Sequence, residues 1–63
     1  MNEEKEKEVR RLAEELFFKQ EQIRIMGMSN TSADPEIRRD QFIKFHVAKA
    51  EEYEMLERLN KAM

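Results

Sequence analysis

The chain contains no cysteine and only one histidine, His46. Without cysteine it can form neither disulfide bonds nor thiolate metal sites. The residues three or four positions from His46 are Phe42, Ile43, Lys49 and Ala50, none of which is a metal ligand that could pair with it on a helix. The single glycine also excludes a glycine-rich loop that binds phosphate. We therefore expect no metal site and no cofactor.

Hydroxyl-bearing nucleophiles are equally scarce. Serine and threonine occur only as Ser29, Thr31 and Ser32, and no histidine or carboxylate base follows them at catalytic spacing. These residues are typical of turns and helix caps instead. The sequence therefore indicates a protein that is not an enzyme.

Long apolar runs are missing too. No uninterrupted stretch approaches the ~20 residues that span a bilayer, and Met1-Asn2-Glu3-Glu4-Lys5 lacks the pattern of a secretory signal. We expect a cytoplasmic protein without a membrane partner, and the short chain beginning at Met is typical of a free-standing small bacterial or phage protein.

Charge of one sign does not dominate, because 12 basic side chains face 14 acidic ones. A balanced chain neutralises few phosphates, so nucleic-acid binding should be weak at physiological salt. One alternative stays open: Arg38 and Arg39 could lie beside Arg24 in a dimer and form a local basic patch for a nucleic-acid-associated regulator.

Helix-breaking residues cluster at one place, residues 27–35. Gly27 suits a left-handed position just past a helix end, Asp34 can cap a new helix, and Pro35 suits its first position. The two arms on either side are rich in good helix formers. The sequence therefore predicts one all-α domain, an antiparallel two-helix hairpin with helices at about 3–26 and 35–62 and a loop at 27–34.

Apolar residues recur at helical spacing on both arms. The expected core-facing side comprises Val9, Leu12, Ala13, Leu16, Phe17, Ile23 and Met26 on the first helix, and Ile37, Phe42, Phe45, Ala48, Tyr53, Leu56, Leu59 and Met63 on the second. Phe18 and Ile25 point away from this side on the first helix, as do Ile43, Val47 and Ala50 on the second. A lone hairpin cannot cover both sides.

The expected register supports the same conclusion. With a loop centred near residues 30 and 31, residue i faces a residue near 61 − i, so that Leu16 faces Phe45. Leu56, Leu59 and Met63 then extend beyond the apolar part of the first helix. We expect another chain to cover them by coiled-coil packing.

These patterns predict a protein–protein interaction module that acts as a regulator, inhibitor or adaptor of a larger protein. We expect two hairpins to form a homodimeric four-helix bundle, with a hairpin that folds on a different protein as the rival. The predicted interface residues are Phe18, Ile25, Ile43, His46, Val47, Tyr53, Leu56 and Leu59.

Two further hypotheses concern chemistry. His46 could act as a pH-sensitive contact, because the charge of imidazole changes near neutral pH. Glu57 and Asn60 lie one turn apart, and Gln20, Gln22 and Gln41 lie elsewhere on the hairpin. An amide or carboxylate from this set could position water for attack on a phosphorylated receiver domain, as in a helical-hairpin phosphatase.

Overall fold

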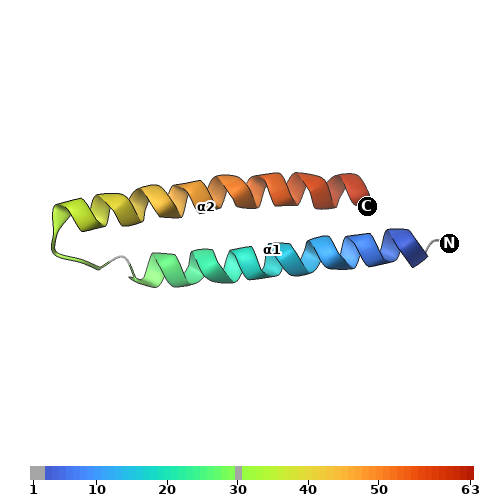
Figure 1. The fold of residues 1–63 in the computed structure, drawn as a ribbon, viewed down its shortest axis with the longest axis horizontal. Helices are drawn as coiled ribbons and strands as arrows, with labels where there is room; N and C mark the ends of the chain where they lie inside the picture. Colours follow the sequence, from blue (N-terminus) through green and yellow to red (C-terminus); the bar gives the residue numbers. More distant parts are fainter. Residues whose placement is uncertain (1–2, 30) are drawn as a thin grey trace.

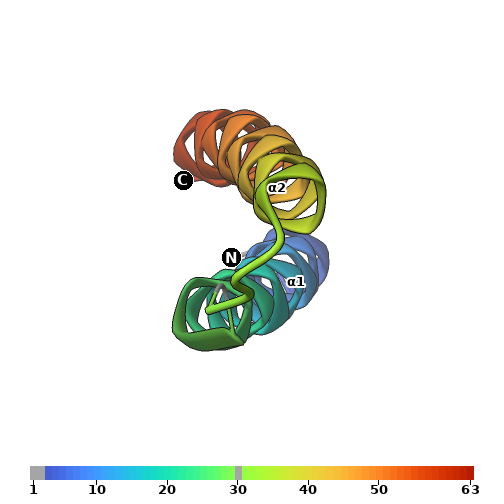
Figure 2. The ribbon, with the colours of Figure 1, turned by 90° about the vertical axis from the view of Figure 1, so that its left-hand side faces the viewer.

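The computed structural model describes residues 3–29 and 31–63. Two α-helices, α1 (Glu3–Ser29) and α2 (Pro35–Ala62), run antiparallel and side by side (Figure 1), and these described residues contain no strand. The predicted all-α pair of packed helices is confirmed. The Cα trace measures 54 × 15 × 10 Å, so the molecule is a bar two helices wide, and its helices cross with a slight twist (Figure 2).

Side chains in the loop determine where α2 begins. Asp34 has extended backbone angles, and its Oδ1 accepts a hydrogen bond of 2.9 Å from the backbone N–H of Glu36. The hydroxyl of Ser32 accepts a further bond of 3.1 Å from the N–H of Asp34. Because Pro35 has no N–H to satisfy, it fits the first turn.

The first helix extends past the predicted end at residue 26, and the predicted cap at Gly27 is wrong. No described residue has a positive φ, so Gly27 continues α1. Gly27 instead lies against an aromatic ring, since a Cβ built on it would be 3.4 Å from Cε1 of Phe45. The helix ends at Ser29, whose hydroxyl donates a hydrogen bond of 2.8 Å to the carbonyl of Ile25.

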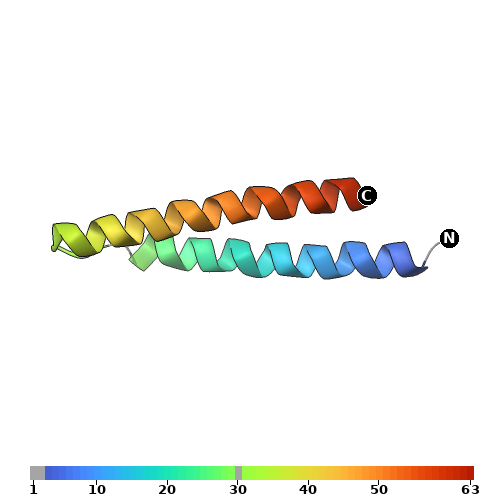
Figure 3. The ribbon, with the colours of Figure 1, turned by 45° about the horizontal axis from the view of Figure 1, so that its top comes forward.

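The register of the two helices also differs from the prediction. Lys19 contacts Glu51 at 2.9 Å, and Gln20 contacts Glu52 at 3.0 Å, so residue i lies opposite a residue near 71 − i rather than 61 − i. The cause is visible at the loop end, where the first turns of α2 project past the end of α1 (Figure 3). The loop carries the chain beyond α1 before α2 turns back.

This register changes which residues the hairpin covers. Leu16 lies level with Met55 and Leu56 rather than with Phe45. Leu56 and Leu59 are half-buried in the hairpin, so α1 shields part of both, whereas the expected register placed them beyond its apolar part. Met63 stays exposed.

The core is a narrow line between the helices, called here the seam. Its buried members are Leu12, Leu16, Ile23 and Ala48. The half-buried positions that continue it are Val9, Lys19 and Met26 on α1, and Gln41, Phe45, Glu52, Met55, Leu59 and Ala62 on α2. On both helices these positions alternate at spacings of three and four, which is the spacing of a coiled-coil seam.

Seven members of the predicted core-facing side lie outside the seam. Leu56 is half-buried, and the exposed six are Ala13, Phe17, Ile37, Phe42, Tyr53 and Met63. The contact between only two helices has room for a narrow stripe of side chains, whereas the predicted stripe was as wide as that of a helix in a larger core. These residues therefore stand at the edges of the contact.

Candidate interaction surface

Two bonds between the helices mark the two broad sides of the bar. Lys19 and Gln20 are consecutive, so their side chains point about 100° apart around α1. Lys19 bonds to Glu51 and Gln20 bonds to Glu52, one bond on each side of the seam. We name these sides the Lys19 face and the Gln20 face.

The Gln20 face collects most of the exposed aromatic side chains. Side chains three or four positions apart share a side of a helix. Phe17 precedes Gln20 by three residues, while Leu56 follows Glu52 by four. The same spacing, continued along both helices, places these apolar and aromatic residues on the Gln20 face: Ala13, Phe17, Phe42, Phe45, His46, Tyr53 and Leu56.

Three rings pack together near the loop end of this face. The ring of Phe42 lies 4.3 Å from that of His46 at a tilt of 54°. Phe45 meets His46 edge to face, with the centroids 5.4 Å apart. His46 and Phe42 remain exposed, while Phe45 is half-buried between them and Gly27. The three rings form an aromatic platform that is open to a partner.

The charges on the Gln20 face are already paired within the chain. Lys49 lies 3.4 Å from Glu52, which also accepts the hydrogen bond from Gln20. Arg24 lies 2.7 Å from Glu21. The hydrogen bond and the negative charge of Glu21 raise the pKa of the Arg24 guanidinium. Because these charges occur in pairs of opposite sign, they add little net charge to the Gln20 face.

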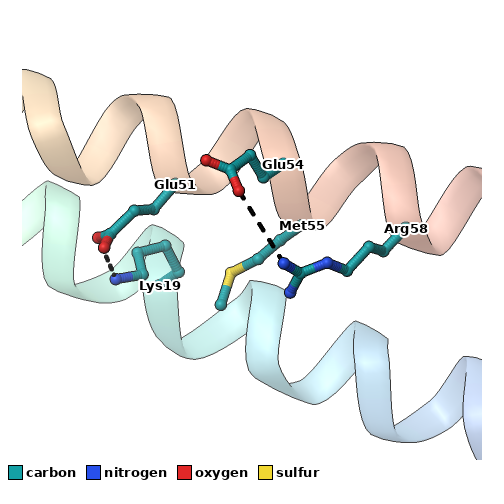
Figure 4. A pocket seen from close by; sticks show the side chains of 5 residues that line it. All are labelled: Lys19, Glu51, Glu54, Met55 and Arg58. Carbon is teal, nitrogen blue, oxygen red and sulfur yellow. Dashed lines mark hydrogen bonds and ion pairs between the residues drawn. The ribbon is translucent and has the colours of Figure 1, made fainter.

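The Lys19 face has a different character, because charged groups line its centre (Figure 4). Lys19 pairs with Glu51 at 2.9 Å, and Arg58 pairs with Glu54 at 3.9 Å. With Met55 beneath them, these four side chains line an open hollow of about 240 Å³. This part of the face is suited to contact with water. Nearer the loop end, Ile25 and Met26 line a second hollow of about 230 Å³ together with Ser29, Gln41 and Lys44.

The apolar residues of the Lys19 face lie at its outer edges. Phe18 and Ile25 flank Gln22 by one turn on α1, and Val47 and Ile43 precede Glu51 by one and two turns on α2. All four apolar residues are exposed. The charged side chains around Lys19 lie between Phe18 and Ile25 on α1 and Ile43 and Val47 on α2.

The structure therefore does not gather the eight predicted interface residues into one patch. Leu56 and Leu59 are half-buried between the helices. His46 and Tyr53 are exposed on the Gln20 face. The other four, Phe18, Ile25, Ile43 and Val47, are exposed at the edges of the Lys19 face.

Sequence reasoning missed the residues that give the Gln20 face its apolar character. Phe17 and Phe42 were assigned to the core-facing side of the helices instead. The signal that could have found them is the alternation of three and four from Val9 to Met26. The residues in this alternation include Lys19 and exclude Phe17, which therefore lies beside the contact between the helices.

The residues behind the chemical alternatives are dispersed. Glu57 and Asn60 are exposed on α2, and the amide of Gln20 already donates to Glu52. Arg38 and Arg39 are exposed at the start of α2, whereas Arg24 is engaged by Glu21.

The described residues lack two features, a metal-binding cluster and a membrane-spanning helix. Within residues 3–29 and 31–63, no cluster of three or more histidine and acidic side chains is arranged to hold a metal ion. Neither of the two described helices is long and apolar enough to cross a membrane.

Comparison of the chain with protein-family models, with curated proteins and with solved structures found no match. Function is therefore inferred from the surface of the hairpin.

Proposed function

We propose that this protein is a protein–protein interaction module that acts by packing its exposed apolar side chains against helices of other chains. In this role it serves as a non-enzymatic regulator, inhibitor or adaptor of a larger protein. Its self-associated form is a homodimeric four-helix bundle, in which the two seams become one core.

One observation supports this function most strongly: the exposed large apolar side chains outnumber the buried ones. Within residues 3–29 and 31–63, four apolar residues are buried, and one of them is an alanine. The large apolar residues with about half or more of their surface exposed are Phe17, Phe18, Ile25, Met28, Ile37, Phe42, Ile43, Val47, Tyr53 and Met63. Contiguous exposed apolar surface marks interaction sites on proteins.

The small core gives the same indication. Among the described residues, three large apolar side chains and one alanine are buried. Chains of this size usually require a disulfide, a metal or association with another chain. Cysteine is absent, so contact with another chain is the remaining source of stability that fits this surface.

Affinity capture from the source cells tests the proposal. The tagged wild-type chain should retain a specific protein that is lost when exposed apolar residues are replaced by serine. Two triple variants cover the two faces: Phe17→Ser with Phe42→Ser and Tyr53→Ser, and Phe18→Ser with Ile25→Ser and Ile43→Ser.

A matched charge variant controls for general surface effects. Arg10→Ser with Glu14→Ser and Lys61→Ser changes three exposed side chains without removing apolar surface. This variant should retain the same protein as the wild type. Retention of the same proteins by every variant, or of none by the wild type, contradicts the proposed function.

A further inference from the structure

Resting on the proposed interaction function, we infer that the Gln20 face is the surface by which two copies of this chain pack against each other. The occupant of the face is a second hairpin, bound face to face. This assignment differs from the sequence-based interface, which included Phe18 and Ile43 at the edges of the opposite side. The other broad side, with its charged centre, remains in contact with solvent.

The surface area of the hairpin matches the need of a dimer. A compact monomer of 7.7 kDa exposes about 4,300 Å², whereas this chain exposes 5248 Å². If each copy buries the difference of about 900 Å², the interface totals about 1,800 Å², within the ~1,200–2,000 Å² of stable interfaces.

The dimensions of the bar give a similar area independently. A broad face of 54 × 15 Å covers about 800 Å², which is the ~800 Å² that each partner contributes to a standard interface. By the same measure the narrow edge of 54 × 10 Å covers about 540 Å² and an end of 15 × 10 Å about 150 Å², both below the area that a partner contributes to a standard interface. One broad face on each copy therefore suffices for a stable dimer.

Composition selects the Gln20 face over the Lys19 face. Interface cores are enriched in aromatic residues and methionine and depleted in charge. Phe17, Phe42 and Tyr53 supply exposed aromatic side chains on the Gln20 face. The Lys19 face would instead bury the line of ions around Lys19, at a large desolvation cost.

Charge is also compatible with a second copy. In a two-fold dimer the same patch meets itself, so a patch of one sign would repel its mate. Lys49 and Arg24 on the Gln20 face are each paired with a carboxylate of the same chain, Glu52 and Glu21 respectively. These groups therefore add no net charge to the two facing surfaces, and the surfaces do not repel each other through them.

Paired variants and light scattering test the assignment. The wild-type chain should have twice the monomer mass at micromolar to submillimolar concentration. Phe17→Glu with Tyr53→Glu should weaken dimerisation at least ~100-fold, because it places charges in the buried contact of both copies. Ile25→Glu with Val47→Glu, equally charged and at the edges of the other face, should leave the dimer intact.

A measurement on the unmodified chain avoids any loss of folding in the variants. Tyr53 is the only tyrosine and tryptophan is absent, so intrinsic fluorescence reports on the Gln20 face alone. Quenching by acrylamide should fall as the protein concentration rises, because the second copy covers Tyr53. Quenching that stays constant while the mass doubles overturns the assignment.

The outcomes separate this inference from the proposed function. A wild-type chain that is monomeric at submillimolar concentration overturns the second-copy assignment, as does a dimer that only the Ile25→Glu/Val47→Glu variant dissociates. If such a monomer still captures a cellular protein through its apolar residues, the interaction function stands without the dimer. If the dimer forms but captures nothing, the regulatory function fails and the assignment stands.

Discussion

Ile23 and Ile25 are the same residue type two positions apart, yet 7% of Ile23 is exposed and 53% of Ile25. We predict that Ile23→Ala lowers the free energy of unfolding by about 2–5 kcal/mol, since it leaves a cavity in the seam. Ile25→Ala should cost less than ~1 kcal/mol. Urea denaturation followed by circular dichroism measures both, and equal losses would contradict the described seam.

Gln41 gives a prediction in the opposite direction. Its side-chain oxygen Oε1 is buried and has no hydrogen-bond partner among the described residues. A buried unpaired acceptor costs about 1–3 kcal/mol, so Gln41→Leu should raise the free energy of unfolding by about 1 kcal/mol. Gln22→Leu is the control, because Gln22 is exposed and should change stability by less than ~0.5 kcal/mol. A loss of stability in Gln41→Leu would indicate a bound water or partner at this oxygen.

Residue identity predicted part of the candidate surface. Tyr53 and His46 were expected in an interface, and both stand exposed on the Gln20 face. Phe17 and Phe42 could not be placed correctly, because a periodic stripe shows which residues share a side but not how wide the contact with the neighbouring helix is. The width depends on how many helices surround the stripe.

A substitution at Gly27 tests whether this residue caps α1 or lies inside it. Because Gly27 is helical with an ordinary φ, Gly27→Ala should raise the free energy of unfolding by about 0.5–1 kcal/mol. The new Cβ would meet the ring of Phe45 at 3.4 Å, an ordinary contact. Thermal unfolding monitored at 222 nm, a wavelength characteristic of helix, provides the measurement.

The competing expectation for this substitution has the opposite sign. If Gly27 held a left-handed cap, alanine would strain the backbone and lower stability by about 1 kcal/mol or more. Ala33→Gly in the loop is a useful reference, since Ala33 is exposed and lies outside both helices. A lower free energy of unfolding in Gly27→Ala would contradict a helical Gly27 and would support the left-handed cap.

The helices themselves could be predicted from local signals, but their register could not. Asp34 and Pro35 identify the start of α2 through the chemistry of the chain at that point. The alignment of Leu16 with Leu56 depends on how far the loop travels past α1, and no local preference specifies that distance. Pairs such as Lys19 with Glu51 follow only once the register is known.

For the whole molecule, small-angle X-ray scattering distinguishes modes of association. The Cα radius of gyration of one hairpin is 15.2 Å, and its longest dimension is 54 Å. Face-to-face packing should double the mass while the maximum dimension stays near that of one hairpin. An end-to-end contact would nearly double the maximum dimension and would contradict packing through a broad face.

The offset between the helices has a consequence for how the hairpin opens. In the described residues, the first turn of α1 has no neighbour on α2, and the first turn of α2 projects beyond Ser29. Amide hydrogens in the first turn of a helix have no carbonyl acceptor within that helix, and at these two ends of the described chain no second helix packs over them. They can exchange with solvent through local fraying, without separation of Leu16 from Leu56. We therefore expect amide exchange to be fast at both ends of the bar and slow in its middle, where the two helices cover each other.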